Sequence, residues 1–323
     1  MTTKVSIILV NYNGMPHVDA CVSSILNQRY PSFEIIFVDN NSSDESLEYV
    51  RSKFPNLIFV ANDKNLGYAG GINAGLAYAT GEYIAPLNID TEVAPNWLSA
   101  MAKFLDENPR VGAVTPKILL FDDRTKINAL GLNIHITGLG FCRGLGKEDD
   151  NSVIPERVPG VSGCSYLIKR EILEQMGGAP EQCFMGNDDV ILSWLINLMG
   201  YEIYCVPGAV VYHKYKLRMN PEKLYSLEKN RQALLLYSLK PLTFVACSLL
   251  FATIELLIIS YCLLHGKAYL KAKFSALWSL GKDRKYIRKR RVQVRKIRKI
   301  SDFRLFKSLR LTLEWRQLFH TLG

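Results

Sequence analysis

The 323 residues suffice for one large domain or two ordinary ones, and an apolar share of 48% allows a sizeable core. The net charge of +10 is unevenly placed, because residues 265–323 contain 18 Lys and Arg against 3 Asp and Glu, whereas residues 1–264 contain 22 against 27. The seven cysteines have no CxxC pair and no zinc-type spacing, which excludes a cysteine-based metal site and indicates reduced thiols in a cytosolic body. The start of the chain has no signal-peptide pattern.

Short apolar runs alternate with segments of helical spacing through the first 90 residues. Buried strands are predicted at residues 5–10, 33–38, 57–61 and 83–87. Helices are predicted at residues 18–27, from Ser43 or Asp44 to just before Pro55, and at residues 70–79. Strands that alternate with helices are typical of βαβ units, so the sequence predicts an α/β fold with a mostly parallel sheet.

Polar residues follow three of these strands. Asn11, Asp39 and Asp90 each come just after a predicted strand. Ligands of parallel sheets bind outside the carboxyl ends of the strands, so we expect these three side chains to converge on one edge of the sheet.

Two short acidic segments lie about a hundred residues apart. One is Leu-Asn-Ile-Asp at residues 87–90, and the other is Gly-Asn-Asp-Asp at 186–189, with a lone His213 further on. Carboxylates and an imidazole can hold a divalent cation, and another carboxylate nearby can accept a proton. A cation site and a proton acceptor are the minimum set of groups for transferring a sugar from a nucleotide diphosphate.

The second half of the chain is less regular. Residues 121–159 are rich in Gly and charge and weakly periodic, which predicts a long loop region over the site, facing the acceptor. Apolar order resumes at residues 161–168. A helix is then expected at residues 190–199, strands at 201–206 and 209–212, and a connecting helix at 221–239.

The C-terminal part combines an apolar stretch with a basic one. Residues 241–264 are long enough to cross a bilayer and are interrupted by Glu255. Residues 268–280 are amphipathic and 282–299 are densely basic. Apolar residues then recur at helical spacing at Phe303, Phe306, Leu309 and Leu313.

The arrangement of these stretches favours contact with a membrane surface. A single crossing would separate the basic tail from a cytosolic body, so the sequence favours a re-entrant hairpin or a helix in the interface, with a true span as the alternative. Lys and Arg would then meet anionic head groups, each contributing about 1 kcal/mol. The apolar neighbour favours lipid over nucleic acid as the partner of the tail.

Four segments in order resemble a known family. They are residues 10–13 (Val-Asn-Tyr-Asn), 37–44 (Phe-Val-Asp-Asn-Asn-Ser-Ser-Asp), 65–75 (Asn-Leu-Gly-Tyr-Ala-Gly-Gly-Ile-Asn-Ala-Gly) and 88–91 (Asn-Ile-Asp-Thr). Over about residues 4–240 the chain resembles family 2 glycosyltransferases of the GT-A fold, and more closely the rhamnosyltransferase-like branch that builds bacterial or archaeal surface polysaccharides. The resemblance implies a Rossmann-like catalytic domain followed by a C-terminal helical, membrane-associated region.

The same resemblance implies a nucleotide site and a metal site. In it Asp39 would accept from the N3–H of a pyrimidine, and Asn11 and Asn13 would touch base and ribose. The other nucleotide-binding residues would be Asn65, Gly67, Asn73 and Asn88. Asp90, in the DxD-type motif, and His213 would hold Mg²⁺ or Mn²⁺. Asn88 replaces the first Asp of a strict DxD motif, which leaves fewer charged ligands.

Asp188 and Asp189 occupy the position of the family's ED motif. The second acid would be the general base that removes the proton of the acceptor hydroxyl. Two adjacent acids also suit a plain helix N-terminus, which favours negative charge. Ile191 stands where the family usually has another acid, and residues 178–181 depart from its acidic pattern, so the acceptor is less well defined than the reaction.

The sequence therefore predicts a metal-dependent inverting glycosyltransferase on the cytoplasmic face of the cell membrane. It would move a sugar from a UDP- or dTDP-sugar to a glycan or lipid-linked glycan. Its predicted parts are a catalytic domain at 1–220, a connecting helix at 221–240, an apolar membrane segment at 241–266 and a basic amphipathic tail at 267–323. The alternatives are a nucleotidyltransferase, which the Asn-Tyr-Asn-Gly loop after the first strand disfavours, and a non-catalytic membrane scaffold.

Overall fold

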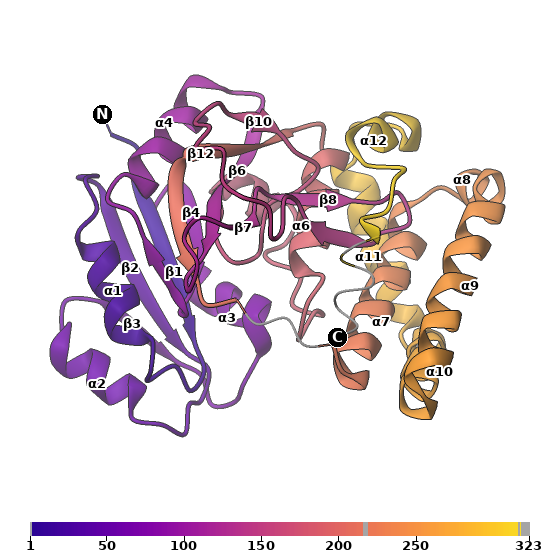
Figure 1. The fold of residues 1–323 in the computed structure, drawn as a ribbon, viewed down its shortest axis with the longest axis horizontal. Helices are drawn as coiled ribbons and strands as arrows, with labels where there is room; N and C mark the ends of the chain where they lie inside the picture. Colours follow the sequence, from indigo (N-terminus) through magenta and orange to yellow (C-terminus); the bar gives the residue numbers. More distant parts are fainter. Residues whose placement is uncertain (1, 216–218, 316, 318–323) are drawn as a thin grey trace.

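The computed structural model describes residues 2–215, 219–315 and 317, and its central feature is a mixed β-sheet (Figure 1). Within the described residues, the main path of this sheet runs β10-β12-β6-β11-β4-β1-β2-β3, with β5 paired to β12 and β7 paired to β6. The strands are β1 (Val5–Asn11), β2 (Phe33–Asp39), β3 (Ile58–Ala61), β4 (Tyr83–Asn88), β5 (Thr91–Val93), β6 (Val111–Leu120), β7 (Ile127–Ala129), β10 (Glu156–Arg157), β11 (Leu167–Lys169) and β12 (Glu202–His213). A separate pair is formed by β8 (Leu132–Ile134) and β9 (Gly140–Cys142).

The parallel part of the sheet has one common register. Strand β1 is buried along its whole length and pairs in parallel with β2 on one side and β4 on the other. Val10 is opposite both Val38 and Asn88, and Asn11 is opposite Asp39. The predicted convergence of strand ends is therefore correct for the backbone.

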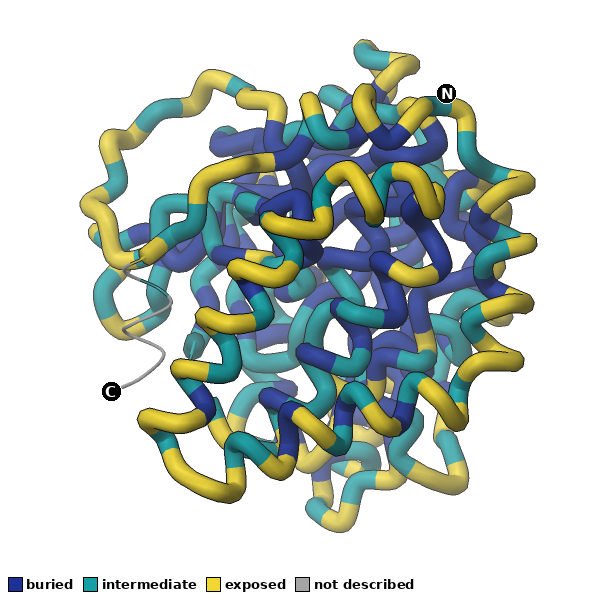
Figure 2. The backbone as a smooth tube through the Cα atoms, turned by 90° about the vertical axis from the view of Figure 1, so that its right-hand side faces the viewer, coloured by how far each residue is buried: buried dark blue, intermediate teal, exposed yellow. Residues whose placement is uncertain are grey.

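Helices cover both faces of the sheet, because alternate residues of a strand point to opposite sides. Ile8 of β1 packs in one buried cluster with Ile72, whereas Ile7 packs in the other with Val22 and Trp97. The helices of the body are α1 (Val18–Leu26), α2 (Ser46–Lys53), α3 (Gly67–Leu76), α4 (Trp97–Glu107), α5 (Arg170–Gln175) and α6 (Asp188–Leu198). Figure 2 shows this buried interior and the exposed outer turns around it.

The region expected to be a long loop is partly ordered into short strands. Strands β7, β8 and β9 have three residues each, too few to show a period in the sequence. Ile134 is fully buried, and Gly131 and Gly138 have positive φ values of 78° and 79° that form the intervening turns. The expectation of a loop over residues 121–159 is wrong for these segments.

Two other expectations differ from the structure. The strands expected at 201–206 and 209–212 form the single strand β12, whose register shifts between Val206 and Val210. The helical spacing expected to continue to Leu313 ends with α12 (Asp302–Ser308), because the next residues pair with β8. Arg310 N donates to Ile134 O at 2.8 Å, and Ile136 N donates to Arg310 O at 3.0 Å.

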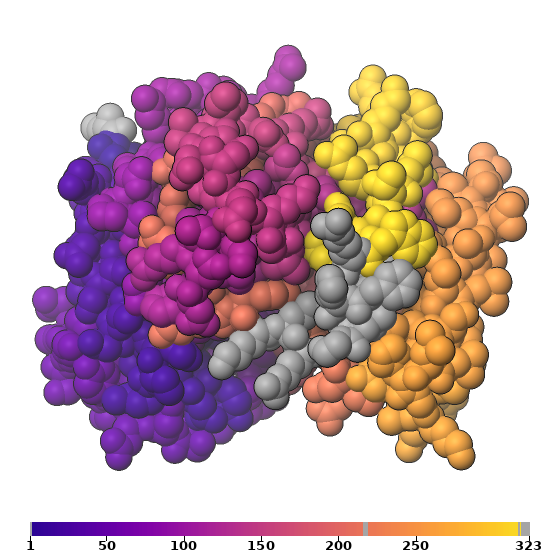
Figure 3. Space-filling model, viewed as in Figure 1, coloured from indigo at the N-terminus to yellow at the C-terminus, as the bar shows by residue number. Residues whose placement is uncertain are grey.

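The C-terminal helices form a layer at one side of the sheet domain, shown in orange and yellow in Figure 3. They are α7 (Pro221–Ser238), α8 (Pro241–Ala246), α9 (Ser248–His265), α10 (Lys267–Lys282), α11 (Arg284–Ile297) and α12. Helix α9 is the single helix among the described residues that is long and apolar enough to cross a membrane, with a mean hydropathy of 1.8. The apolar stretch expected at 241–264 is thus divided at Cys247 into α8 and α9.

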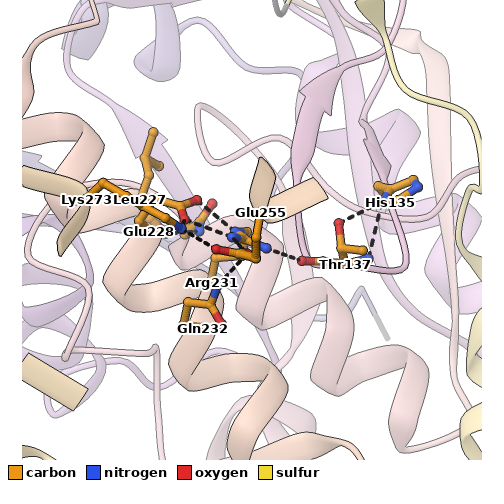
Figure 4. A network of polar contacts seen from close by, with 9 residues as sticks. His135, Thr137, Leu227, Glu228, Arg231, Gln232, Glu255 and Lys273 are labelled. Carbon is orange, nitrogen blue, oxygen red and sulfur yellow. Dashed lines mark hydrogen bonds and ion pairs between the residues drawn. The ribbon is translucent and has the colours of Figure 1, made fainter. Parts of the chain in front are cut away.

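Paired charges join three of these helices (Figure 4). Glu228 and Arg231 of α7 are 3% and 1% exposed and pair at 2.8 Å. Lys273 of α10 is fully buried and contacts Glu228 and Glu255, the latter at 2.5 Å. Glu255, the charge that interrupts the apolar stretch, also accepts from Arg231 at 2.5 Å and from Gln232 at 2.6 Å. This charge cluster fixes the orientation of α9 on α7 and α10.

Replacing Lys273 with Met should destabilise the fold strongly. Loss of Lys273 leaves two carboxylates, Glu228 and Glu255, with a single cation, Arg231, and an uncompensated buried charge costs about 3–5 kcal/mol. The free energy of unfolding, measured by urea titration, checks this expectation. Lys103→Met is the matched control, because Lys103 lies in an exposed pair with Glu107 at 3.8 Å, with 75% of its side chain exposed. Equal stability of the two variants would contradict the role given to the cluster.

Candidate active site

A cavity of about 390 Å³ opens at the carboxyl ends of β1 and β4. The four segments that the sequence pattern singled out supply most of its wall. The lining residues are Val10, Tyr12, Asn13, Gly14, His17, Asn40, Asn65, Gly67, Tyr68, Asn88, Ile89, Asp90, Phe184 and Met185. A cavity of this size is in the range of ligand pockets, about 300–1,000 Å³.

Asn11 and Asp39 do not line this cavity. Asn11 is fully buried and Asp39 is 3% exposed. The amide of Asn11 donates to Asp39 Oδ1 at 2.8 Å and to Ser46 Oγ at 2.8 Å, and Asp39 Oδ1 also accepts from Ser42 Oγ at 2.6 Å. The hydrogen-bonded pair of Asn11 and Asp39 therefore stabilises the loop after β2. Its contact with a nucleotide remains a prediction.

Asn13, Asn65 and Gly67 form turns at the cavity wall. Asn13 has a φ of 53°, and its Oδ1 accepts from Ser43 N at 2.7 Å. Asn65 Oδ1 accepts from Gly67 N at 2.8 Å. Gly67 has a φ of 74°, and a Cβ there would lie 2.5 Å from Phe184 O, so a side chain is excluded.

Asn73 lies outside the cavity wall. Its amide donates to Ala179 O at 3.0 Å and its Oδ1 accepts from Ala179 N at 2.7 Å. These two bonds tie helix α3 to the segment that precedes Phe184 and Met185. Asn73 thus holds one side of the cavity in place.

Asp90 and His213 lie side by side because β5 pairs antiparallel with the end of β12, with Thr91 opposite His213. Asp90 Oδ1 is 3.4 Å from His213 Nε2, with 33% of the Asp90 side chain exposed. Asn128 Oδ1 accepts from His213 Nδ1 at 2.9 Å. This contact leaves Nε2 directed at Asp90, which is the arrangement of a metal-binding histidine with a supporting partner.

The two side chains fit a divalent cation. Ligand atoms at about 2.0–2.1 Å from one octahedral ion lie roughly 3 Å apart, and the observed separation is close to this value. Among the described residues, no group of three or more His, Cys, Asp or Glu could hold an ion, so Asp90 and His213 are the two such ligands that this part of the chain offers there. Mg²⁺ is commonly bound by few carboxylates together with substrate phosphates and water.

In the protein without an ion, Asp90 and His213 form a charged pair. Burial opposes the charge of His213, but Cys164 and Asp90 outweigh burial and raise the pKa of His213 to about 10. Burial likewise opposes ionisation of Asp90, and the contact with His213 lowers the pKa of that carboxyl. A cation must therefore displace a proton from His213.

Asp188 and Asp189 occupy the first turn of α6, after Asn187, which has a φ of 65°. Asp189 Oδ2 accepts from Gly163 N at 3.2 Å, and its Oδ1 accepts from Val190 N at 2.8 Å. A Cβ on Gly163 would lie only 3.2 Å from Asp189 Oδ2. Because residue 163 is a glycine, no side chain crowds the Asp189 carboxylate at this position.

The neighbouring residue, Cys164, contacts the other half of the site. Cys164 O accepts from Asn88 N at 2.9 Å. The dipeptide Gly163-Cys164 thus contacts Asp189 at one residue and the strand end that carries Asp90 at the next. The structure brings the two predicted acidic segments to one place.

Both carboxyls of the acidic pair have raised pKa values. Burial is the main cause for each, and for Asp188 the charge of Asp189 adds to it. Hydrogen bonds from Gly163 and Val190 oppose the rise at Asp189 without cancelling it. A carboxylate with a raised pKa is a better proton acceptor near neutral pH.

Sequence patterns missed two residues of the site. The Tyr68 hydroxyl is buried and has no hydrogen-bond partner among the described residues, and the charges of Asp188 and Asp90 both raise its pKa, after burial as the main cause. Tyr68 lies inside the segment at 65–75, but the resemblance gave it no role. Asn128 lies in β7, where the sequence predicted a loop, so no pattern indicated its contact with His213.

Comparison with known proteins identifies the family of the chain. Residues 6–177 match the family model described as glycosyl transferase family 2, which is more than half of the chain. The chain belongs to glycosyl transferase family 2. The expected family is confirmed, whereas the rhamnosyltransferase-like branch stays a prediction.

Relatives of this family 2 chain include the poly-β-1,6-N-acetyl-D-glucosamine synthase of Staphylococcus epidermidis. The two are 29% identical over 231 residues, which are 70% of this chain and 52% of the relative. The synthase of Staphylococcus aureus strain COL is 28% identical over the same share. The chain therefore spans about half the length of these relatives.

Solved structures share the fold of this family 2 chain. GalNAc-T7 with UDP, GalNAc and Mn²⁺ superposes with a TM-score of 0.59 at 19% identity, covering 72% of this chain and 48% of that one. A mannosyltransferase of Pyrobaculum calidifontis with GDP-Man and Mn²⁺ superposes with a TM-score of 0.56 at 22% identity, covering 92% and 86%. The predicted GT-A fold, an α/β domain with a mostly parallel sheet and a helical C-terminal region, is confirmed.

Asp90→Asn should weaken Mn²⁺ binding by about tenfold or more, since it removes the carboxylate of the pair and leaves the neutral imidazole of His213. Isothermal titration with Mn²⁺ in the presence of UDP measures the affinity. In the unsubstituted chain the affinity should also rise with pH up to about pH 10, because the proton on His213 competes with the ion. Asp122→Asn, a change at an exposed acid, is the control. Unchanged Mn²⁺ affinity in Asp90→Asn would exclude the site.

Proposed function

We propose that the chain is a metal-dependent inverting glycosyltransferase, which takes a sugar from a UDP- or dTDP-linked donor. One observation carries this proposal: the dipeptide Gly163-Cys164 holds a candidate base, Asp189, next to the strand end that presents Asp90. A leaving diphosphate and an attacking hydroxyl need adjacent groups of these two kinds. A cation at Asp90 and His213 would supply charge stabilisation for the departing diphosphate.

In the proposed reaction Asp189 takes the proton of an acceptor hydroxyl. That oxygen forms a bond to the anomeric carbon while the bond from this carbon to the phosphate oxygen breaks, so one displacement inverts the configuration. The charge of Asp189 raises the pKa of Asp188, after burial as the main cause, so Asp188 is the weaker acid beside an ionised base. No covalent intermediate with the chain is required.

The nucleotide would bind in the cavity, against the part of its wall that is formed by Asn13, Asn65, Gly67 and Asn88. Asn11, Asp39 and Asn73 contribute by fixing the loops that carry this wall, and Asp39 is the proposed partner of the pyrimidine. The exposed Tyr12, at 53%, provides an aromatic face beside the same wall. This arrangement favours a pyrimidine nucleotide over a bare sugar phosphate.

Two observations favour two different candidate donor sugars. The motifs favour the rhamnosyltransferase-like branch, hence a dTDP-linked 6-deoxyhexose. The names of the relatives favour an N-acetylglucosamine unit, hence UDP-N-acetylglucosamine as the second candidate. The acceptor would be a growing glycan or lipid-linked glycan of the cell surface.

The C-terminal helices would hold the enzyme on the cytoplasmic face of the membrane. Helix α9 packs its charged residue, Glu255, against α7 and α10, while apolar residues elsewhere on α8 and α9 face outward. Leu242, Leu249 and Leu264 are 79%, 81% and 83% exposed. These features support a helix that lies in the membrane interface, with the basic tail at residues 267–323 against anionic lipid.

Asp189→Asn should lower donor turnover by about 10²–10⁴, the usual contribution of a general base. Release of UDP or dTDP with acceptor present measures the turnover. Asp188→Asn is the neighbouring control and should lose less, because it does not contact Gly163. Equal activity of Asp189→Asn and the unsubstituted chain would remove Asp189 as the base.

The rate should depend on pH through the same carboxylate. Burial raises the pKa of Asp189 above its ordinary 3.8, and the base acts when ionised, so turnover should rise with pH with a midpoint above that value. Asp189→Asn should lack this rise. A pH–rate profile between acidic and neutral conditions checks the expectation, and a midpoint at or below the ordinary value would contradict it.

A panel of nucleotide sugars tests the donor class. UDP- and dTDP-sugars should raise the melting temperature with Mn²⁺ present, because a ligand that binds only the folded state stabilises it. GDP-mannose, which carries a purine, is the control. Failure of every uridine and thymidine donor would contradict the proposed function.

A further inference from the structure

A second cavity lies away from the active site, where α7 ends and α11 packs beside it. Its volume is about 500 Å³. The wall consists of the chain between the two helices α7 and α8 together with one face of α11. The lining residues are Tyr237, Ser238, Leu239, Lys240, Pro241, Leu242, Arg291, Val294, Arg295 and Arg298.

The charge of this wall is strongly one-sided. Four of its residues are cationic, namely Lys240, Arg291, Arg295 and Arg298, and none is acidic. Arg298 pairs with Asp302 at 2.5 Å, whereas Lys240 and Arg295 form no ion pair with any of the described residues. Several cations around one hollow repel each other unless an anion joins them, so the cavity has the chemistry of an anion site.

Hydrogen bonds place two of these arginines firmly. The guanidinium of Arg291 donates to Leu236 O at 3.3 Å and to Leu239 O at 3.1 Å, at the end of α7. Arg298 donates to Ser238 O, and Asp302 Oδ2 accepts from Lys240 N at 2.9 Å. The cationic groups are thus held on both sides of the hollow before any ligand binds.

One residue of the cavity wall also has an unpaired polar atom. Ser238 is 4% exposed, and its Oγ has no hydrogen-bond partner among the described residues. A buried hydroxyl without a partner is costly and is usually satisfied by a ligand or water. A phosphate oxygen would be an acceptor for this hydroxyl as well as for the arginines.

Exposed apolar side chains at the edge of the cavity favour a lipid over a free anion as its ligand. Leu242, in the wall of the cavity, is 79% exposed, and Val245, one turn further along α8, is 72% exposed. Leu249, at the start of α9, is 81% exposed. A phosphate group in the cavity would therefore have apolar side chains beside it, as at the boundary between head groups and acyl chains.

We infer that this cavity binds the phosphate head group of an anionic phospholipid. The contacts would come from Lys240, Arg291 and Arg295, while Leu242 and Val245 meet the acyl chains. The inference rests on the proposed membrane association and is independent of sugar transfer. It makes one lipid molecule, rather than diffuse surface charge, the anchor point of α8 and α9.

Monomeric lipid tests this inference with the full chain. Dihexanoyl phosphatidylglycerol, kept below its micelle concentration, should bind saturably in isothermal titration. The double variant Lys240→Gln, Arg295→Gln should bind about thirtyfold more weakly, because each of the two lost cations contributes about 1 kcal/mol near a lipid phosphate. Both side chains are exposed, so the variant should fold, and its melting temperature verifies this.

The matched control is Arg284→Gln, Lys285→Gln, which removes two exposed cations of α11 that do not line the cavity. It should bind the monomeric lipid as the unsubstituted chain does. Equal losses in the two double variants would show general charge attraction only and would overturn the inference. Binding of inorganic phosphate as tightly as the lipid would also overturn it, in favour of a free-phosphate site.

Release of UDP or dTDP separates this inference from the proposed function. The Lys240→Gln, Arg295→Gln variant should keep its turnover of a soluble donor, since neither residue lies near the active-site cavity. An active chain that fails to bind the lipid overturns the inference alone. A chain that binds the lipid through these two residues supports the inference even when no donor is turned over, and then the proposed function alone fails.

Discussion

The backbone of Gly163 and Cys164 joins the two chemical halves of the site. One residue donates to the carboxylate of Asp189 at 3.2 Å, and the next accepts from Asn88 N at 2.9 Å. These bonds hold the start of α6 against the end of β4, although the two elements lie about a hundred residues apart in sequence. The absence of a side chain at position 163 is what allows the carboxylate to approach this closely.

The common register of β1, β2 and β4 provides the platform for this contact. Parallel pairing brings Val10, Val38 and Asn88 to one level, so the loops after the strands meet at one edge. The buried pair Asn11 and Asp39 stiffens that edge from below the loops. The active-site cavity is therefore a property of strand ends and not of any single motif.

A second constraint acts in the C-terminal helices. Glu255 pairs with Arg231 and Lys273, which turns the one charged position of α9 toward the protein and leaves apolar side chains outside. The same organisation places the basic α11 beside α7, where the cavity proposed to bind a lipid head group is formed. The proposed sites of catalysis and of membrane attachment thus occupy separate regions of one chain.

Much of the fold could be predicted from the sequence where the elements are long and uniformly buried. The strands predicted at residues 5–10, 33–38 and 83–87 lie within one or two residues of β1, β2 and β4. A short continuous apolar run is typical of a strand that is buried on both faces of a sheet. The short strands β7 to β9 could not be predicted, since three residues carry no period and their burial depends on distant partners. The helix beyond Ser308 was wrong because Arg310 pairs with β8 instead.

The sequence by itself determined the family, the α/β class and the residue types of the candidate site, because strand-end acids and glycine-rich turns are local patterns. Tertiary structure alone decided which of those residues face the cavity: Asn13, Asn65 and Asp90 line it, whereas Asn11, Asp39 and Asn73 support it. It also decided the partners of His213, Asp189 and Glu255. These contacts join residues that lie between 18 and 123 positions apart in the sequence. Their geometry follows from packing of the whole sheet and its helices, which no local pattern encodes.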